Sequence, residues 1–132
     1  MTIIDKVAWL RLEDGKVLAA RSRGKDTYYI PGGKREPGES DLQTLVREVA
    51  EELAVTIDPA GAAHAGTFEA QAHGRTSGTT VRITCYTADY RGTLTPSAEI
   101  EEVTWLGHAD RDRVSPATRQ ILDQLHAAGE LR

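Results

Sequence analysis

The sequence predicts a single α/β domain in which helices cover a sheet. Two observations lead to this class. Segments of alternating apolar and polar residues lie on both sides of one strongly patterned helix, and a second helical pattern closes the chain. The length of 132 residues suits one domain with a core of its own and is short for two. The whole chain, residues 1–132, is therefore expected to be one domain.

The part of the chain before residue 40 is expected to contain two strands, because apolar and polar residues alternate on either side of a turn pair. Asp14 and Gly15 form that pair, which is typical of a tight hairpin. The strands are expected over residues 3–12 and 16–21. A polar loop is expected over 23–27, and residues 28–33 lead to a glycine pair.

A helix is predicted over residues 40–53, and its signals agree with one another. Ser40 occupies the N-cap position, and Gln43 three residues later completes a capping-box pattern. Apolar residues recur at helical spacing and form one stripe, at Leu42, Leu45, Val46, Val49, Ala50 and Leu53. One side of this helix is therefore expected to be buried, which leaves the other side for polar groups.

The second half of the chain alternates in the manner of strands and ends in a helix. Ser115 and Pro116 supply an N-cap followed by proline at the first helical position, and Gly129 is expected to end that helix. The strands are expected over residues 55–57, 62–72, 81–87 and 102–106, with a glycine-rich polar loop over 71–80. This order predicts a mixed sheet covered by helices.

Three carboxylates stand together on the helix at 40–53. Glu48, Glu51 and Glu52 occupy positions i, i+3 and i+4, which share a face. Like charges at this spacing weaken a helix by about 0.2–0.5 kcal/mol per pair. A shared Mg²⁺ or Mn²⁺ ion would offset that cost, because these ions take oxygen ligands. The alternative is a solvated acidic face.

The same segment resembles the signature of the Nudix hydrolases over residues 33–55. The matching positions are Gly33, Glu39, Arg47, Glu48, Val49, Glu51, Glu52 and Val55. Ala54 is the one departure, because the family usually has glycine there, and a left-handed helix end costs alanine roughly 1 kcal/mol. The resemblance implies an α/β/α sandwich with a curved mixed sheet, in which the signature forms a loop–helix–loop that bears the metal.

The resemblance also implies metal ligands. Glu48 and Glu52 are the first candidates, because they lie one turn apart on the same edge of the helix. Glu51 is either a further ligand or the base that takes a proton from water. Gly33 is expected to contribute a backbone carbonyl, and Glu39 to bind the metal through water.

Two charged residues complete the catalytic set of Arg47, Glu51, Glu52 and Glu99. Arg47 is expected to orient a glutamate of the signature, with Glu51 and Glu39 as the candidate partners. In the family a glutamate from a later loop binds metal or acts as base, and Glu99 is the best match here. The alternative for Glu99 is a solvated acidic turn.

Residues just before the signature are the candidates for substrate binding. Arg21, Arg23 and Lys25 are placed to meet phosphates, with a solvated basic loop as the alternative. Tyr28 is a candidate for stacking on a base, and the alternative is a core aromatic. The loop over 71–80 is a candidate for closing over the substrate.

Composition favours an enzyme that acts on a small molecule. The net charge of −4 and the pI near 5.5 argue against a nucleic-acid polymer as partner, because phosphate-backbone binding needs a basic surface. The single cysteine, Cys85, excludes an internal disulfide and is expected in the core. No apolar run reaches membrane-spanning length and the start lacks a secretory pattern, so the protein is expected in the cytoplasm. Monomer and homodimer both remain open.

The expected activity is metal-dependent hydrolysis of a nucleoside diphosphate joined to another moiety. Family branches that act on ADP-ribose, dinucleoside polyphosphates, coenzyme A or NADH carry further patterns that this chain lacks. The favoured substrate is therefore a (deoxy)nucleoside triphosphate, which water attack on phosphorus would split into monophosphate and pyrophosphate. The alternatives are a catalytically silent nucleotide-binding sensor domain, and a hydrolase of a nucleotide sugar or a capped RNA end.

Overall fold

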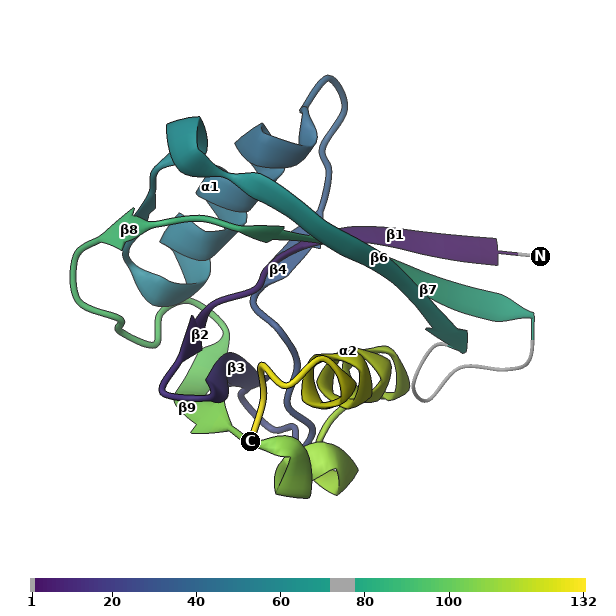
Figure 1. Cartoon of the computed structure of the whole chain (residues 1–132). Coiled ribbons are helices and arrows are strands. Elements are labelled where there is room, and N and C mark those ends of the chain that lie inside the picture. Colours follow the sequence, from purple (N-terminus) through teal and green to yellow (C-terminus); the bar gives the residue numbers. More distant parts are fainter. Residues whose placement is uncertain (1, 72–77) are drawn as a thin grey trace.

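The structure, a computed structural model, describes residues 2–71 and 78–132 (Figure 1). The loop expected over 71–80, with His73 and Arg75, therefore falls largely outside the described residues. Within the described part of the chain, no helix has the length and apolarity to cross a membrane.

The larger sheet contains four strands in the order β4-β1-β7-β6. Its central pair, β1 (Thr2–Trp9) and β7 (Thr79–Thr87), is parallel. The outer strands, β4 (Gly32–Lys34) and β6 (Ala63–Gln71), run antiparallel to their neighbours. The sheet is therefore mixed, as the sequence predicts.

Two smaller sheets contain the other strands of the described residues. One has the order β2-β3-β9, formed by Leu12–Glu13, Lys16–Ser22 and Ile100–Leu106. The other pairs β5 (Thr56–Ile57) with β8 (Tyr90–Arg91). The sequence did not predict β8, and β9 begins two residues before the expected start at 102.

The single strand expected over residues 3–12 is in fact two strands in different sheets. Between β1 and β2 the chain changes partner: the Leu10 N–H donates to the Tyr86 carbonyl at 2.8 Å, and the Arg11 carbonyl accepts from the Leu18 N–H at 2.9 Å. Apolar and polar residues keep alternating through this crossing. Periodicity alone therefore could not reveal the break.

Two helices cover opposite faces of the sheets (Figure 1). Along β1, Val7 and Trp9 belong to the core beneath α1 (Asp41–Leu53). Ala8 belongs to the core beneath α2 (Pro116–Ala127). Successive side chains of a strand point to opposite faces, so one strand serves both cores. The predicted α/β/α sandwich is confirmed.

Shorter features complete the chain. Two 3₁₀ helices, η1 (Pro59–Gly61) and η2 (His108–Arg113), precede β6 and α2. Cys85 is fully buried, and burial raises the pKa of its thiol to about 12, which fits the expected core role.

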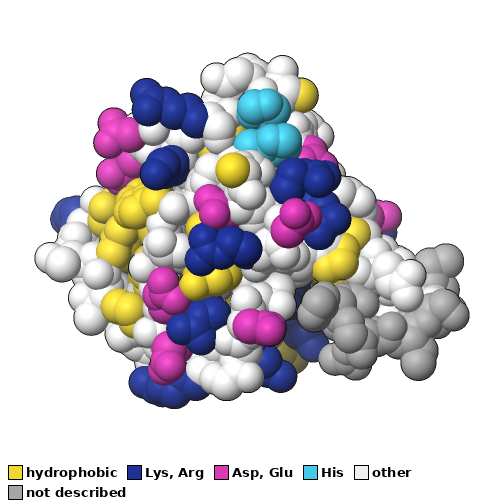
Figure 2. Space-filling view, turned by 90° about the horizontal axis from the view of Figure 1, so that it is seen from below, with side chains coloured by type: hydrophobic (Ala, Val, Ile, Leu, Met, Phe, Trp, Pro, Cys, Tyr) yellow, Lys and Arg dark blue, Asp and Glu magenta, His cyan; other side chains and the backbone are white. Residues whose placement is uncertain are grey.

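Seen from below Figure 1, the described surface carries interspersed basic and acidic side chains (Figure 2). Ion pairs near η2 join Arg111 to Asp123, Arg113 to Asp110 and Arg119 to Asp112.

Both ends of α1 follow from local sequence. The Ser40 hydroxyl accepts from the Gln43 N–H at 3.1 Å, and the Ser40 N–H donates to the Gln43 side chain at 2.8 Å, so the predicted capping box is present. At the other end Ala54 adopts the left-handed conformation with φ 58°. Alanine thus occupies a backbone position that favours glycine.

Replacing Ala54 by glycine is expected to stabilise the protein by about 0.5–1 kcal/mol, because glycine adopts positive φ without the steric cost. The free energy of unfolding from urea titration measures this gain. Ala50→Gly is the matched control. Ala50 was expected in the buried stripe but is exposed inside the same helix, and glycine there should cost roughly 1 kcal/mol. Equal destabilisation by both changes would refute the strain at Ala54.

Candidate active site

A cleft of about 700 Å³ gathers acidic groups and apolar surface. Glu48 and Glu52 reach it from α1, and Glu99 reaches it from the loop before β9. Apolar side chains line it from β7 and from the segment before β4. They include Val81, Ile83 and Ile30. The cleft therefore combines a carboxylate cluster with a wall that could contact a base.

Glu52 is almost fully buried, with 5% of its surface exposed. Burial, together with the nearby charges of Glu48 and Glu99, raises the pKa of its carboxyl to about 8. The Gly32 N–H, which donates to Glu52 Oε1 at 3.1 Å, opposes this shift. A bound cation would stabilise the ionised form of this carboxylate, because burial and two neighbouring carboxylates otherwise disfavour that form.

The Glu48 carboxylate lies directly against Gly33. A Cβ added at Gly33 would meet three atoms of that carboxyl group at 2.4–2.6 Å, so only glycine leaves room for it. Burial raises the pKa of Glu48, and the charge of Glu51 adds to the effect while that of Arg47 opposes it. The signature glycine therefore shapes the space that the first candidate ligand occupies.

Arg47 holds the loop before α1 in place. Its guanidinium donates to both carboxylate oxygens of Glu39, at 2.7 and 2.8 Å, and to the Lys34 carbonyl at 3.1 Å. The hydrogen bonds that Glu39 accepts from Arg47, with a further one from the Glu36 N–H, lower the pKa of Glu39 to about 2. Arg47 Nη1 also lies 3.4 Å from Glu48. Arg47 thus contacts glutamates of the signature, in agreement with an orienting role, and Glu39 is its main partner.

Glu51 differs from the other two carboxylates of the face. Its side chain is 56% exposed, pairs with Arg47 at 3.6 Å, and is not among the described residues that line the cleft. In residues 2–71 and 78–132, no three acidic, histidine or cysteine side chains converge at ligand spacing. Mg²⁺ is commonly bound by only one or two carboxylates together with substrate phosphates. Glu48 and Glu52 fit that kind of site.

Main-chain contacts bring Glu99 to the cleft. The Glu99 carbonyl accepts from the Arg23 N–H at 2.8 Å, and the neighbouring Ser97 N–H donates to the Glu52 carbonyl at 2.9 Å. The Arg23 guanidinium donates to the Ala98 carbonyl at 2.6 Å. Arg23 therefore contacts the loop that carries Glu99, and its guanidinium is engaged away from the cleft.

The four residues predicted to bind substrate take different places. Among the described residues, the lining of the cleft includes Lys25 but not Arg21, Arg23 or Tyr28. Tyr28 is 7% exposed, and its hydroxyl donates to Glu102 at 2.7 Å. It is therefore a core residue, which was the alternative to stacking on a base. Arg21 also binds Glu102. The aromatic residue that does line the cleft is its neighbour Tyr29.

Sequence reasoning missed two lysines in the cleft, Lys6 and Lys34. Lys34 directly follows the glycine pair, and this position could have drawn attention to it. Lys6 lies in a strand far from the signature and carries no local signal.

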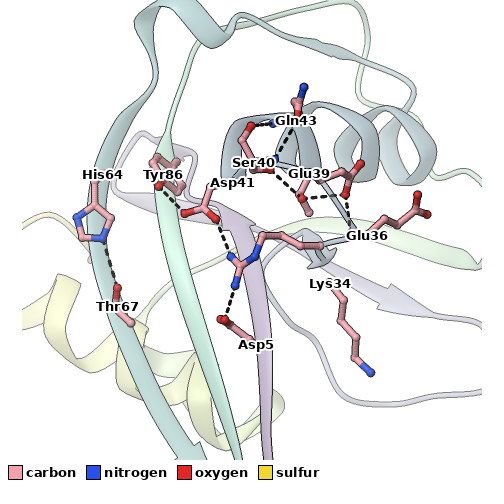
Figure 3. Close-up of polar contacts among 12 residues, drawn as sticks. Asp5, Lys34, Glu36, Glu39, Ser40, Asp41, Gln43, His64, Thr67 and Tyr86 are labelled. Atoms are coloured by element: carbon pink, nitrogen blue, oxygen red, sulfur yellow. Dashed lines mark hydrogen bonds and ion pairs between the residues drawn. The ribbon is translucent and has the colours of Figure 1, made fainter.

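A polar chain ties the loop before α1 to the large sheet (Figure 3). Arg35 contacts Asp5 of β1 and donates to Asp41 at 2.6 Å. Asp41 also accepts from the Tyr86 hydroxyl at 2.7 Å. Since Asp41 is the first residue of α1, these contacts fix where the helix starts relative to the sheet.

Comparisons with known proteins cover most of the chain. A family model described as the NUDIX domain matches residues 4–125. The CTP pyrophosphohydrolase of Escherichia coli (strain K12) is 32% identical over 110 residues, which cover 80% of this chain and 76% of the relative.

Two solved structures show the same fold. The solution structure of the E. coli ORF135 protein has a TM-score of 0.70 and 28% identity, covering 97% of this chain and 94% of the other. The crystal structure of a MutT NUDIX hydrolase from Burkholderia pseudomallei has a TM-score of 0.75 and 19% identity, covering 95% and 99%.

Proposed function

This chain belongs to the Nudix family, and from that membership we propose that it hydrolyses a nucleoside triphosphate to a monophosphate and pyrophosphate. The chain is a Nudix pyrophosphohydrolase, and such enzymes act on small-molecule nucleoside diphosphate derivatives with a divalent metal ion.

The observation that carries the proposal is the composition of one cleft. The buried Glu52 and the partly buried Glu48 line the cavity together with Glu99, and an apolar wall with Val81 and Ile83 belongs to the same cavity. The carboxylates suit a metal–diphosphate group, and the apolar wall suits a nucleobase. A volume of about 700 Å³ lies in the range of small-molecule sites.

The metal would be held by Glu48 and Glu52, and Glu99 lines the same cleft. We propose that the metal is Mg²⁺ and that Mn²⁺ can replace it. Such an ion supplies Lewis acidity toward phosphate oxygens and lowers the pKa of water. The buried Glu52 and the fitted space over Gly33 are consistent with this group. We also propose that Glu39 contacts the metal through a water molecule and that the backbone carbonyl of Gly33 is a metal ligand.

The chain itself is proposed to position groups and to accept a proton. The Gly32 N–H holds one oxygen of Glu52, and Arg47 fixes the loop through Glu39. Of the two candidates for the base, we favour Glu99 over Glu51, because Glu99 lines the cleft and Glu51 is 56% exposed.

The substrate class is tested by hydrolysis of a panel with Mg²⁺ and then Mn²⁺. The panel contains ribo- and deoxyribonucleoside triphosphates, ADP-ribose, a nucleotide sugar, a dinucleoside polyphosphate and capped RNA. CTP is the first member to test, because the relative at 32% identity is a CTP pyrophosphohydrolase. We expect the highest kcat/KM for a triphosphate, with monophosphate and pyrophosphate as the products.

Reaction in ¹⁸O-labelled water identifies the phosphorus that water attacks, because the label enters only one of the two products. Turnover of a non-triphosphate member at a kcat/KM above that of every triphosphate would overturn the proposed substrate. Nucleotide binding without turnover of any member would favour a sensor domain.

A further inference from the structure

We propose that Lys6 and Lys34 form a phosphate subsite that holds the part of the substrate released as pyrophosphate. The two residues are direct partners in the register of β1 and β4. Side chains directly opposite each other on an antiparallel pair share a face, with Cβ atoms roughly 4.5–5.5 Å apart. Two ammonium groups are thus anchored side by side, and both line the cleft.

Like charges at such positions repel each other. A phosphate bound between the two ammonium groups would reduce that repulsion, since an oxyanion accepts hydrogen bonds from both. The charge of Lys6 also extends to the carboxylate cluster, because it lowers the pKa of Glu52 against the larger effect of burial. The lysines therefore lie beside the proposed metal ligands.

A row of strand partners in the lining of the cleft runs from basic to apolar. Lys34 on β4 is the partner of Lys6 on β1, and Lys6 is the partner of Ile83 on β7. Ile83 belongs to the core beneath α2. A substrate lying along this row would place its phosphates at the β4 edge and its base toward β7.

This order gives the subsite a preference. A nucleotide with a single diphosphate link to an uncharged group offers no phosphate beyond the link, whereas a triphosphate offers one more. The inference rests on the proposed hydrolysis of a triphosphate and adds to it the residues that select the third phosphate.

The test measures binding of inorganic pyrophosphate and of CMP separately, by calorimetry in the presence of Mg²⁺. Lys6→Met and Lys34→Met keep the aliphatic stem and remove the charge. Each should weaken pyrophosphate binding about tenfold, the effect of losing one hydrogen bond to a charged group. CMP binding should change by less than about twofold by the same measure.

Matched variants control for charge and folding. Lys16→Met removes the same charge from an exposed position at the start of β3 and should leave pyrophosphate binding unchanged. Lys6→Arg and Lys34→Arg keep the charge and should retain the binding within about threefold. Thermal unfolding should show that the methionine variants are folded, with a cooperative transition like that of the wild type.

Unchanged pyrophosphate affinity in the Lys6→Met/Lys34→Met double variant would overturn the inference. Equal weakening of pyrophosphate and CMP binding would also overturn it, because the lysines would then act as a general attraction. Lysine-dependent pyrophosphate binding in a protein that hydrolyses no triphosphate would support the subsite while refuting the proposed function.

Discussion

Replacing Glu52 by glutamine is expected to lower kcat by on the order of 10²–10⁴-fold, the range for loss of a central acid–base or ligand group. The change is nearly isosteric and keeps an oxygen that can accept from the Gly32 N–H, which now reaches Glu52 Oε1 at 3.1 Å. The loss would therefore come from the missing negative charge. Steady-state kinetics on the best triphosphate of the panel measures it.

The same variant should gain stability at alkaline pH when metal is absent. Burial raises the pKa of Glu52 from 4.5 to about 8, so between these values the folded protein holds a proton that the unfolded chain has released. Stability from this group is complete below pH 4.5 and is lost as the pH rises through 8. Glutamine has no proton to lose, and at pH 8.5 the gain should be on the order of a few kcal/mol.

Urea unfolding in EDTA at pH 4.5 and pH 8.5 measures this difference. The variant and the wild type should be close at the lower pH and separate at the higher one. Glu130→Gln, at an exposed position near the end of the chain, is the control and should show no separation. A Glu52→Gln protein with more than about a tenth of wild-type kcat would contradict the central role of this carboxylate.

Replacing Gly33 by alanine is expected to lower kcat/KM on the order of 10²-fold with little change in stability. The added Cβ would lie 2.4 Å from the Glu48 carboxyl carbon and 2.4 Å from one of its oxygens, closer than ordinary contacts allow. The clash involves the end of a flexible side chain, which can rotate away without disturbing the core. A displacement of about 1 Å at a reacting centre is enough for such a loss.

Direct Mn²⁺ binding and thermal unfolding should separate the two effects in Gly33→Ala, with affinity reduced and the melting temperature retained. Gly61→Ala is the matched control, since a Cβ at Gly61 meets no atom within 4 Å. If Gly33→Ala binds Mn²⁺ as tightly as the wild type, the space over Gly33 is not what places the ligand.

Features that depend on neighbours along the chain could be predicted from the sequence. The capping box at Ser40, the apolar stripe of α1 and the left-handed residue after it involve groups within a few positions of one another. The placement of Glu48 and Glu52 one turn apart follows from the same regularity. The resemblance over residues 33–55 rests on this local pattern, and the family match over residues 4–125 confirms it.

The remaining features depend on contacts between distant segments. Periodicity predicted that three carboxylates share one face of the helix, but packing buried Glu52, whereas the side chain of Glu51 is 56% exposed and pairs with Arg47. Tyr28 is a buried residue whose hydroxyl donates a hydrogen bond to Glu102, which is 74 positions away along the chain.

The sequence by itself determined the helix that carries the carboxylates, because short-range periodicity encodes it, and the resemblance of residues 33–55 to the Nudix signature indicated the family and the class of chemistry. Only the tertiary structure decided which charges share the cleft. Glu99 arrives there through hydrogen bonds to Arg23, and Lys6 meets Lys34 through strand register. Burial and register are properties of the assembled chain, and they set the pKa of Glu52 and the basic edge of the site.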